Sequence, residues 1–239
     1  MLSQPSAKLT DVWHVFFPPR CMACDDVLER ETYFCGHCEL GVEPIGPHAC
    51  ATCGEPGVFE TGRCPSCVKT RWRLARAKAP YLHHGAVAKA VHRFKYEDHP
   101  ELGWRLARWA FAELGAGAFA GFDAVCAIPL HSTRFWARQY DQATLLAAEW
   151  ANCTGVPLRH WLRRHKATAR QVDLSDAQRA LNVWRAFEAK AEAQGKVILL
   201  VDDVLTTGAT GNAAAHALYE AGATRVELLT LARARKNAV

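Results

Sequence analysis

The sequence predicts an α/β protein with a mainly parallel sheet flanked by helices, preceded by a small metal-bound module. After residue 80, short apolar runs typical of buried strands alternate with segments in which apolar residues recur every three or four positions. Before residue 68, eight of the ten cysteines form four C-x2-C pairs. The first pattern predicts the sheet and its helices, and the second predicts the metal-bound module.

The elements after residue 80 follow one another in a βαβ order. Three apolar runs predict strands, and the periodic segments predict helices, two of which end near Gly155 and Gly222. Strands that alternate with helices form βαβ units, whose strands are parallel. The expected helices cover 86–96, 100–114, 142–153 and 211–221, and the expected strands cover 123–130, 196–201 and 225–231.

The four cysteine pairs have the spacing of zinc ligands. Two C-x2-C turns bring four sulfurs to one tetrahedral ion, so eight cysteines predict two structural zinc sites, with an iron–sulfur cluster as the main alternative. Sequential pairing of the turns is favoured, although pairing the first with the third and the second with the fourth satisfies the same chemistry. The expected ligands are Cys21, Cys24, Cys35, Cys38, Cys50, Cys53, Cys64 and Cys67.

The remaining thiols and the histidines near the ligands are not expected to bind metal. Eight sulfurs already fill two sites, so His37 and His48 are interpreted as surface residues. Cys126, in an apolar strand, and Cys153, near a helix end, are expected to be inert buried thiols.

The composition predicts a globular protein without a membrane span. Hydrophobic residues make up 50% and charged residues 22% of the 239 residues, which is typical of a folded domain. No run of 18 apolar residues occurs. No signal peptide is recognised, because the apolar stretch 12–17 contains His14 and stops at Pro18. A cytoplasmic location is therefore expected, where thiols stay reduced and disulfides are rare.

Charge is distributed unevenly along the chain. Residues 1–62 have a balance of −6 and residues 63–108 a balance of +8. Within the basic stretch, Trp72 and Tyr81 alternate with cations, a pattern that suits single-stranded nucleic acid. The alternative is a solvated linker with Trp72 packed into the domain. The cations are Lys69, Arg71, Arg73, Arg76 and Lys78.

A second strong motif follows the most apolar run. The strand 197–201 ends in Asp202 and Asp203, after which come a threonine- and glycine-rich loop and a helix. A loop that leads into a helix N-terminus offers free N–H groups to a phosphate, and paired carboxylates can accept hydrogen bonds from ribose hydroxyls. The alternative is an acidic surface turn followed by a threonine N-cap. A Walker-type phosphate loop is excluded, since no G-x4-G-K-[ST] occurs.

On these residues the sequence resembles a known family. Residues 198–210 resemble the phosphoribosyl-diphosphate (PRPP) signature of type I phosphoribosyltransferases, and the whole chain resembles the ComF family. The resemblance implies a type I phosphoribosyltransferase fold over 71–239, preceded over 1–70 by a double zinc ribbon with a short N-terminal helix. It also implies two structural zinc ions, Mg2+ with PRPP, and an association with competence, natural transformation and DNA uptake. Further matching segments are 17–21, 93–96, 128–134, 138–142, 170–171 and 179–182.

The resemblance also implies roles for individual residues. Pyrophosphate would be held by the loop 129–138 through Arg134 and Arg138, with Lys95 and Tyr96 reaching the same anion. The segment 163–179 would be a hood loop over PRPP, and a plain exposed loop is the alternative. The expected ligands of PRPP in the signature itself are Asp202, Asp203, Thr206, Thr207, Gly208, Ala209 and Thr210.

Two departures from the family pattern affect the expected chemistry. The run 138–142 reads Arg-Gln-Tyr-Asp-Gln where an Arg-Gly-Phe-Asn-Gln run is expected, which puts a tight turn in doubt. Thr206 occupies the position at which 6-oxopurine transferases place an aspartate, so no general base is evident and no catalytic residue is assigned.

Two functions therefore remain open. The first is an enzyme of nucleotide metabolism that displaces pyrophosphate from C1 of PRPP with a base or amine. The second is a non-catalytic protein of natural transformation that handles single-stranded DNA, works with the DNA-uptake machinery, and keeps the PRPP site.

Overall fold

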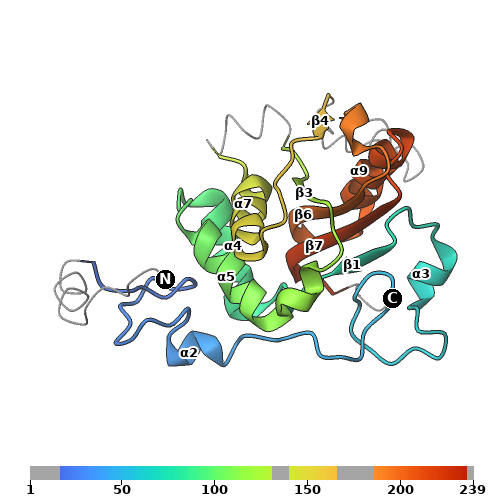
Figure 1. Cartoon of the computed structure of the whole chain (residues 1–239). Helices are drawn as coiled ribbons and strands as arrows, with labels where there is room; N and C mark the ends of the chain where they lie inside the picture. Colours follow the sequence, from blue (N-terminus) through green and yellow to red (C-terminus); the bar gives the residue numbers. More distant parts are fainter. Residues whose placement is uncertain (1–16, 131–139, 166–185, 236–239) are drawn as a thin grey trace, which may run out of the picture.

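The central element is a five-stranded, wholly parallel sheet (Figure 1). The computed structural model describes residues 17–130, 140–165 and 186–235. The strand order is β1-β7-β6-β3, and β2 also pairs with β7 beyond the end of β1. The parallel α/β architecture expected from the sequence is therefore confirmed. The strands are β1 (Arg76–Lys78), β2 (Tyr81–Leu82), β3 (Ala124–Ala127), β6 (Val197–Leu205) and β7 (Arg225–Arg233).

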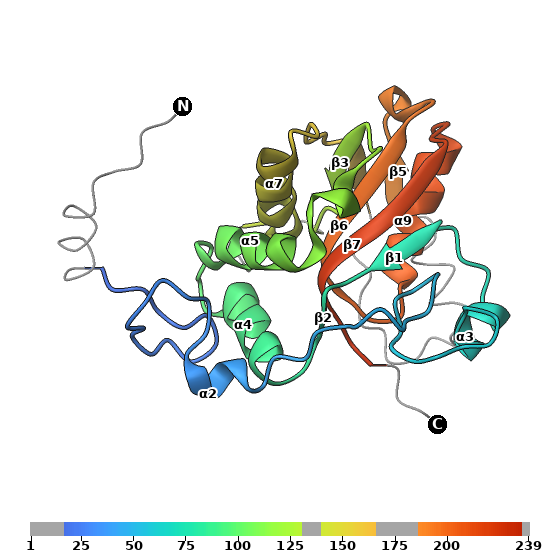
Figure 2. The same cartoon turned by 60° about the horizontal axis from the view of Figure 1, so that its bottom comes forward.

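Helices cover both faces of the sheet, as Figures 1 and 2 show. One layer contains α4 (Gly85–Tyr96), α5 (Leu102–Leu114) and α7 (Gln142–Thr154). The other contains α9 (Ala209–Glu220), which packs against the antiparallel pair β4 (Leu162–Arg164) and β5 (Phe187–Ala189). None of the helices within the described ranges has the length and apolar character that a membrane crossing requires. The short helices are α2 (Gly36–Glu39), α3 (Pro65–Lys69), η1 (Ala116–Phe119) and η2 (Ala191–Ala193).

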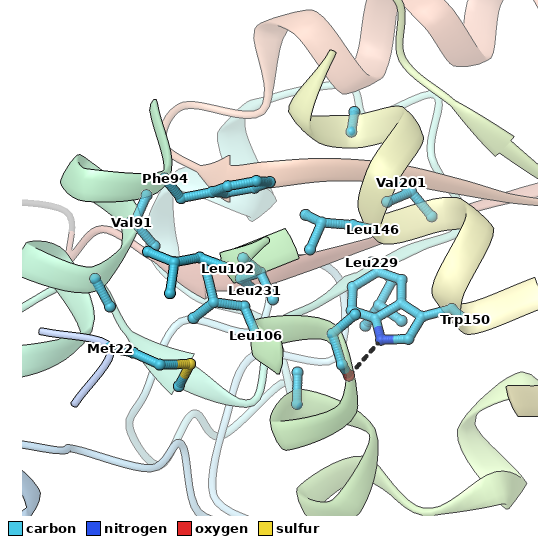
Figure 3. Packing of buried hydrophobic residues seen from close by; sticks show 14 of the residues in the cluster. Met22, Val91, Phe94, Leu102, Leu106, Leu146, Trp150, Val201, Leu229 and Leu231 are labelled. Carbon is cyan, nitrogen blue, oxygen red and sulfur yellow. Dashed lines mark hydrogen bonds between the residues drawn. The ribbon is translucent and has the colours of Figure 1, made fainter. Parts of the chain in front are cut away.

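The core consists of two buried clusters, one on each face of the sheet. Leu199 and Val201 of β6 face the α4–α5–α7 layer, whereas Ile198 and Leu200 face α9. Trp150 of α7 is fully buried in the first cluster, and its indole N–H donates to the Ala107 carbonyl at 2.8 Å (Figure 3). The ring therefore adds apolar area to the core without leaving a buried donor unpaired.

The strand that precedes the threonine loop is longer than expected. β6 continues through both aspartates to Leu205, because β7 runs beside it and pairs Asp202 with Thr230 and Leu205 with Arg233. Gly208 then adopts φ +81° and turns the chain directly into α9. The loop is consequently only three residues long, 206–208, and both carboxylates lie at the end of a rigid strand.

The cysteine-rich segment packs on the α/β domain and contributes to its core. Met22 and Phe34 belong to the same buried cluster as Phe94 and Leu106, and Figure 3 shows Met22 close to this helical layer. The chain between the two halves of the segment also hydrogen-bonds to the start of the domain, as in the 2.7 Å bond from the Ile45 N–H to the Pro80 carbonyl. Unfolding of this segment would therefore remove Met22 and Phe34 from the core.

Candidate functional site

The structure groups the eight expected ligands in sequential order. Within each set the four sulfur atoms lie within 4.8 Å of one another. All four members of the second set are buried, whereas Cys24 of the first set is exposed. Cys126 is buried as expected, but Cys153 is exposed on the last turn of α7, so the expectation that it is buried was wrong. The first set is Cys21, Cys24, Cys35 and Cys38, and the second is Cys50, Cys53, Cys64 and Cys67.

The chemistry of both sets fits zinc. Four sulfurs at this separation match a closed tetrahedral site with no open position. Burial and the neighbouring cysteines raise the pKa of the Cys67 thiol, so four thiolates would not stay together without a cation. The N–H of Cys64 donates to the Cys50 sulfur at 3.2 Å, as expected where a backbone amide steadies a thiolate. Zinc bound here would have a structural role.

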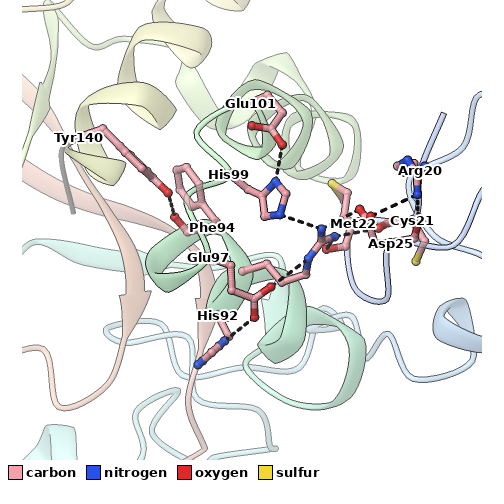
Figure 4. Close-up of polar contacts among 11 residues, drawn as sticks. Arg20, Cys21, Met22, Asp25, His92, Phe94, Glu97, His99, Glu101 and Tyr140 are labelled. Carbon is pink, nitrogen blue, oxygen red and sulfur yellow. Dashed lines mark hydrogen bonds and ion pairs between the residues drawn. The ribbon is translucent and has the colours of Figure 1, made fainter. Parts of the chain in front are cut away.

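A buried arginine of α4 holds the first cysteine set. Arg93 of α4 binds the loop that carries Cys21, and Figure 4 shows Cys21, Met22 and Asp25 of this loop. Its Nη1 donates to the carbonyls of Cys21 and Met22, both at 3.2 Å, and its Nη2 lies 2.7 Å from Asp25 Oδ1. Only 8% of Arg93 is exposed. The first set is thus joined to the helix that also carries Lys95.

A second buried arginine holds the second cysteine set in the same way. Arg233, the last residue of β7, is fully buried, and its Nη1 donates to the Cys53 carbonyl at 2.6 Å. Its Nε donates to Glu55 Oε2 at 2.9 Å. The second set is therefore joined to the end of the central sheet by a buried, hydrogen-bonded ion pair.

Arg233→Met is expected to lower the free energy of unfolding by about 3–5 kcal/mol, because it leaves the Glu55 carboxylate buried without its cation. The matched control is Arg235→Met. Arg235 pairs with Glu43 across an exposed surface, so its loss is expected to change stability by less than about 1 kcal/mol. Urea unfolding of the zinc-loaded proteins measures both values. Equal effects of the two substitutions would contradict this account.

Three charged side chains meet at the carboxyl end of β6. Lys95 Nζ lies 2.7 Å from Asp203 Oδ1, and both side chains are largely buried. Asp202 accepts the N–H of Asp203 at 2.9 Å through its own carboxylate. The structure thus brings together Lys95 and the acidic pair, which lie more than 100 residues apart in the sequence.

Burial governs the protonation of this cluster. Burial, and then the neighbouring Asp203 charge, raises the pKa of Asp202 to about 7. His83, which follows β2, interacts electrostatically with Lys95 and Asp203, and burial lowers its pKa. His83 is a titratable neighbour that the sequence reading did not single out. Only its position after a strand that ends at the same edge of the sheet could have indicated it.

Asp202→Asn is expected to stabilise the folded protein. A carboxyl whose pKa is raised by folding binds its proton more tightly in the folded state, so its contribution to stability is lost as pH rises from about 4 to about 7. The free energy of unfolding of the variant should therefore exceed that of the wild type by about 1–2 kcal/mol at pH 8 and by less at pH 5. Thermal unfolding at the two pH values tests this, with the exposed Asp98→Asn as control. A gain that does not depend on pH, or a loss at pH 8, would contradict the assignment.

The loop after the acidic pair presents its backbone to solvent. Thr206, Thr207 and Ala209 are exposed, whereas Gly208 is buried. Among the described residues, no acceptor is found for the N–H groups of 206–208, and the Ala209 N–H bonds only to the Thr207 hydroxyl at 3.3 Å. Thr210, in the first turn of α9, is half-buried. Free amides at a helix N-terminus make this loop suitable for an anion.

The loop expected to hold pyrophosphate lies largely outside the described residues. Arg134 and Arg138 fall within 131–139, and most of the expected hood segment falls within 166–185, so no structure is assigned to either. Asp141 caps α7 by accepting the Ala143 N–H at 3.1 Å, and its other oxygen accepts the Leu130 N–H at 3.4 Å. This single carboxylate thus ties together the two described ends of the loop, a role that sequence reasoning missed.

The aromatic residues that the sequence singled out, one for pyrophosphate and two for single-stranded DNA, have different surroundings. Tyr96, expected to reach pyrophosphate, is 62% exposed, and its ring contacts the ring of His92. Tyr81 is buried and stacks on Trp109 at 3.7 Å between ring centroids. Trp72 is half-buried between the second cysteine set and the α9 side of the core. The interpretation of these two rings as stacking platforms was therefore wrong, and the alternative of packing into the domain holds.

Comparison with known families agrees with this organisation. The family described as "Double zinc ribbon domain" matches residues 12–68, and the family described as "Phosphoribosyl transferase domain" matches residues 95–239. The first range contains both cysteine sets, and the second contains Lys95, the acidic pair and the threonine loop.

Similar proteins share most of the length of the chain. "DNA utilization protein YhgH" of Salmonella typhimurium is 31% identical over 199 residues, covering 77% of this chain and 83% of that protein. "Competence protein F" of Haemophilus influenzae is 28% identical over 230 residues, covering 92% and 99%. "Competence protein ComFC" of Bacillus subtilis is 28% identical over 232 residues, covering 89% and 94%. With a double zinc ribbon followed by a phosphoribosyl transferase domain, and with competence proteins as relatives over nearly its whole length, the chain belongs to the ComF family.

Proposed function

We propose that the chain binds PRPP at the carboxyl end of β6 and transfers its phosphoribosyl group to a base or amine. The observation that supports this best is the cluster of Lys95, Asp203 and Asp202 beside the open threonine loop. Carboxylates repel a phosphate, so a site built for phosphate alone would not place two of them next to its binding loop. A phosphorylated sugar needs both features.

Each part of the cluster has a role in holding such a ligand. The amides of 206–208 and the threonine hydroxyls donate to the 5-phosphate, and the N-terminus of α9 adds its dipole. Asp202 and Asp203 accept hydrogen bonds from the vicinal ribose hydroxyls. Lys95 offsets the negative charge of Asp203 and keeps its carboxylate oriented. Carboxylate oxygens are also ligands that suit Mg2+, which when bound with PRPP would neutralise the diphosphate.

The reaction we propose is a displacement at C1 of the ribose. The bond from C1 to the diphosphate oxygen breaks, a bond from the acceptor nitrogen to C1 forms, and that nitrogen loses a proton to solvent or to a nearby base. Pyrophosphate leaves with the bonding electrons. Positioning by the strand end and the loop supplies the orientation that such a displacement requires.

Pyrophosphate release tests the transfer step. The zinc-loaded protein is incubated with PRPP, Mg2+ and a panel of nucleobases and amines, and pyrophosphate is measured against reactions without acceptor. We expect one class of acceptor to raise the rate of release above this background. PRPP that stays intact with every acceptor, although it binds, would refute the transfer step and leave a binding protein.

A second candidate function, the handling of single-stranded DNA, is supported by the relatives named for DNA utilization and competence. Lys69 and Arg71 are exposed beside the second cysteine set and are available to phosphates. Replacing both by serine should lower the affinity for single-stranded DNA. The slope of log K against log salt concentration should become shallower by about 0.7 for each lost phosphate contact. The control is Lys89→Ser, an exposed lysine of α4. Fluorescence anisotropy with a labelled oligonucleotide measures this, and affinity without salt dependence would refute DNA binding through these cations.

A further inference from the structure

We propose that Trp72 is a positioning residue through which the second cysteine set fixes the shape of the phosphate loop. The inference rests on the proposed function, because the ligand whose affinity it controls is PRPP. It predicts that zinc at the second set and PRPP at the loop stabilise each other, although neither touches the other's ligands.

The first observation is the contact between Trp72 and Gly208. A Cβ built on Gly208 would lie 2.4 Å from Cη2 and 2.9 Å from Cζ3 of the indole, so the ring rests directly on the loop backbone. Gly208 also has φ +81°, a conformation that residues with a side chain rarely adopt. Only glycine satisfies both conditions, and the ring limits the conformations open to the loop.

The second observation is that the same ring packs on the second cysteine set. Trp72 and Phe59 are the partly buried side chains that contact this cluster, and Trp72 also contacts the core cluster beneath α9. Cys67 lies in α3, which ends at Lys69, so only two residues separate that helix from Trp72. The position of the ring therefore depends on the fold of the metal-binding segment.

The third observation extends the contact to the first turn of α9. The Asn212 side chain accepts the N–H of Arg73 at 2.8 Å and that of Leu74 at 3.2 Å. A Cβ on Gly211 would lie 3.1 Å from the Leu74 side chain, which shows how closely this turn approaches the same segment. The helix N-terminus and the segment that follows the second set are thus docked together by both polar and apolar contacts.

The strand that leads into the loop is connected to the same cysteine set. Leu205 pairs with Arg233 across the sheet, and the Ala234 N–H donates to the Leu205 carbonyl at 2.9 Å. Arg233 in turn binds the Cys53 carbonyl. The loop is therefore held at its start through Arg233 and at its end through Trp72.

The exposure of the loop residues indicates that the Trp72 ring supports the loop and does not block access of a ligand to it. Gly208 is buried beneath the ring, but Thr206, Thr207 and Ala209 remain exposed. The ring covers Gly208 and leaves the residues on both sides of it open to a ligand. Removing it should therefore weaken binding by loosening the loop, whereas an obstructing ring would have the opposite effect.

The test compares PRPP affinity among variants of the full, zinc-loaded chain by calorimetry with Mg2+. We expect Trp72→Ala to bind PRPP at least tenfold more weakly and Trp72→Phe, which keeps a ring, to stay within threefold of the wild type. Trp104→Ala is the control, because Trp104 is 47% exposed on α5, in the helical layer on the opposite side of the sheet from α9. Unchanged affinity in Trp72→Ala, or tighter binding, would overturn the proposal.

A second measurement does not depend on the stability of the alanine variant. Zinc release from the wild type to a chromogenic chelator is followed with and without PRPP, since coupling between two binding sites is reciprocal. PRPP should slow release from the buried second set more than release from the first set, whose Cys24 is exposed. If PRPP binds but neither release phase changes, this inference alone fails. If the wild type binds no PRPP, the proposed function fails with it.

Discussion

The double substitution Asp202→Asn/Asp203→Asn is expected to lower the affinity for PRPP at least about 100-fold, because each carboxylate loses a charge-assisted hydrogen bond to a ribose hydroxyl worth about 1.5–3 kcal/mol. The protein should remain folded and keep its zinc. The Asp202 carboxyl is held at a raised pKa by burial, so the folded chain does not need this charge, whereas loss of the Asp203 charge leaves Lys95 without its partner and lowers the stability. Calorimetric titration with PRPP and Mg2+ measures the loss.

The matched control is Asp123, which lies just before β3 and beside the opposite end of β6. Asp123 accepts the Val197 N–H at 2.8 Å where β6 begins, far from the threonine loop, and asparagine can still accept that bond. Asp123→Asn should bind PRPP as the wild type does. Equal affinity in the double variant and the wild type would remove the sugar-binding role from the acidic pair.

Zinc removal is expected to have the largest effect on the fold. Structural zinc in a four-cysteine site contributes about 10–16 kcal/mol, and the segment it holds has little core of its own. Chelation should unfold residues 20–70, with new protease cuts there and a change in circular dichroism. Metal analysis should show two zinc ions per chain before chelation and none after it. An unchanged protease pattern and spectrum after the metal is lost would contradict the prediction.

The effect of zinc loss should extend beyond the cysteine segment. Met22 is part of the core beside α4, and Arg93 of that helix donates three of its hydrogen bonds to residues 21–25. Without the first set, the buried Arg93 would lose the Asp25 carboxylate and two carbonyl acceptors and would keep Glu97 of its own helix, and α4 would lose a packing surface. Because α4 also carries Lys95, loss of the first zinc should weaken the Lys95–Asp203 pair.

Structural features that depend on a short stretch of sequence were predictable. The spacing of the cysteines indicated two four-sulfur sites, since a C-x2-C turn is a local structure, and the sets form in sequential order. The apolar run that ends in Asp202 indicated a buried strand, and the threonines and Gly208 that follow it indicated a loop at a helix N-terminus. Chain geometry over a dozen residues is enough for each of these inferences.

Contacts between distant segments were not predictable. Arg93 and Arg233 bind carbonyl and carboxylate groups 68–72 and 178–180 residues away, and no local pattern marks a cation that will be buried. In the sequence, Trp72 and Tyr81 look like exposed aromatic residues among cations, but burial in the fold gives both a packing role. Lys95 was indicated by family resemblance alone, because only the fold brings α4 to the end of β6.

The most direct test of the central claim is amide hydrogen exchange of the loop itself. The zinc-loaded wild type is compared with and without saturating PRPP and Mg2+, and exchange is read in peptides that cover 202–212. We expect slower exchange at 206–210, where the free amides would donate to the phosphate, and no change in the exposed segment around Val58. Unaltered exchange at 206–210 in the presence of saturating PRPP would contradict it.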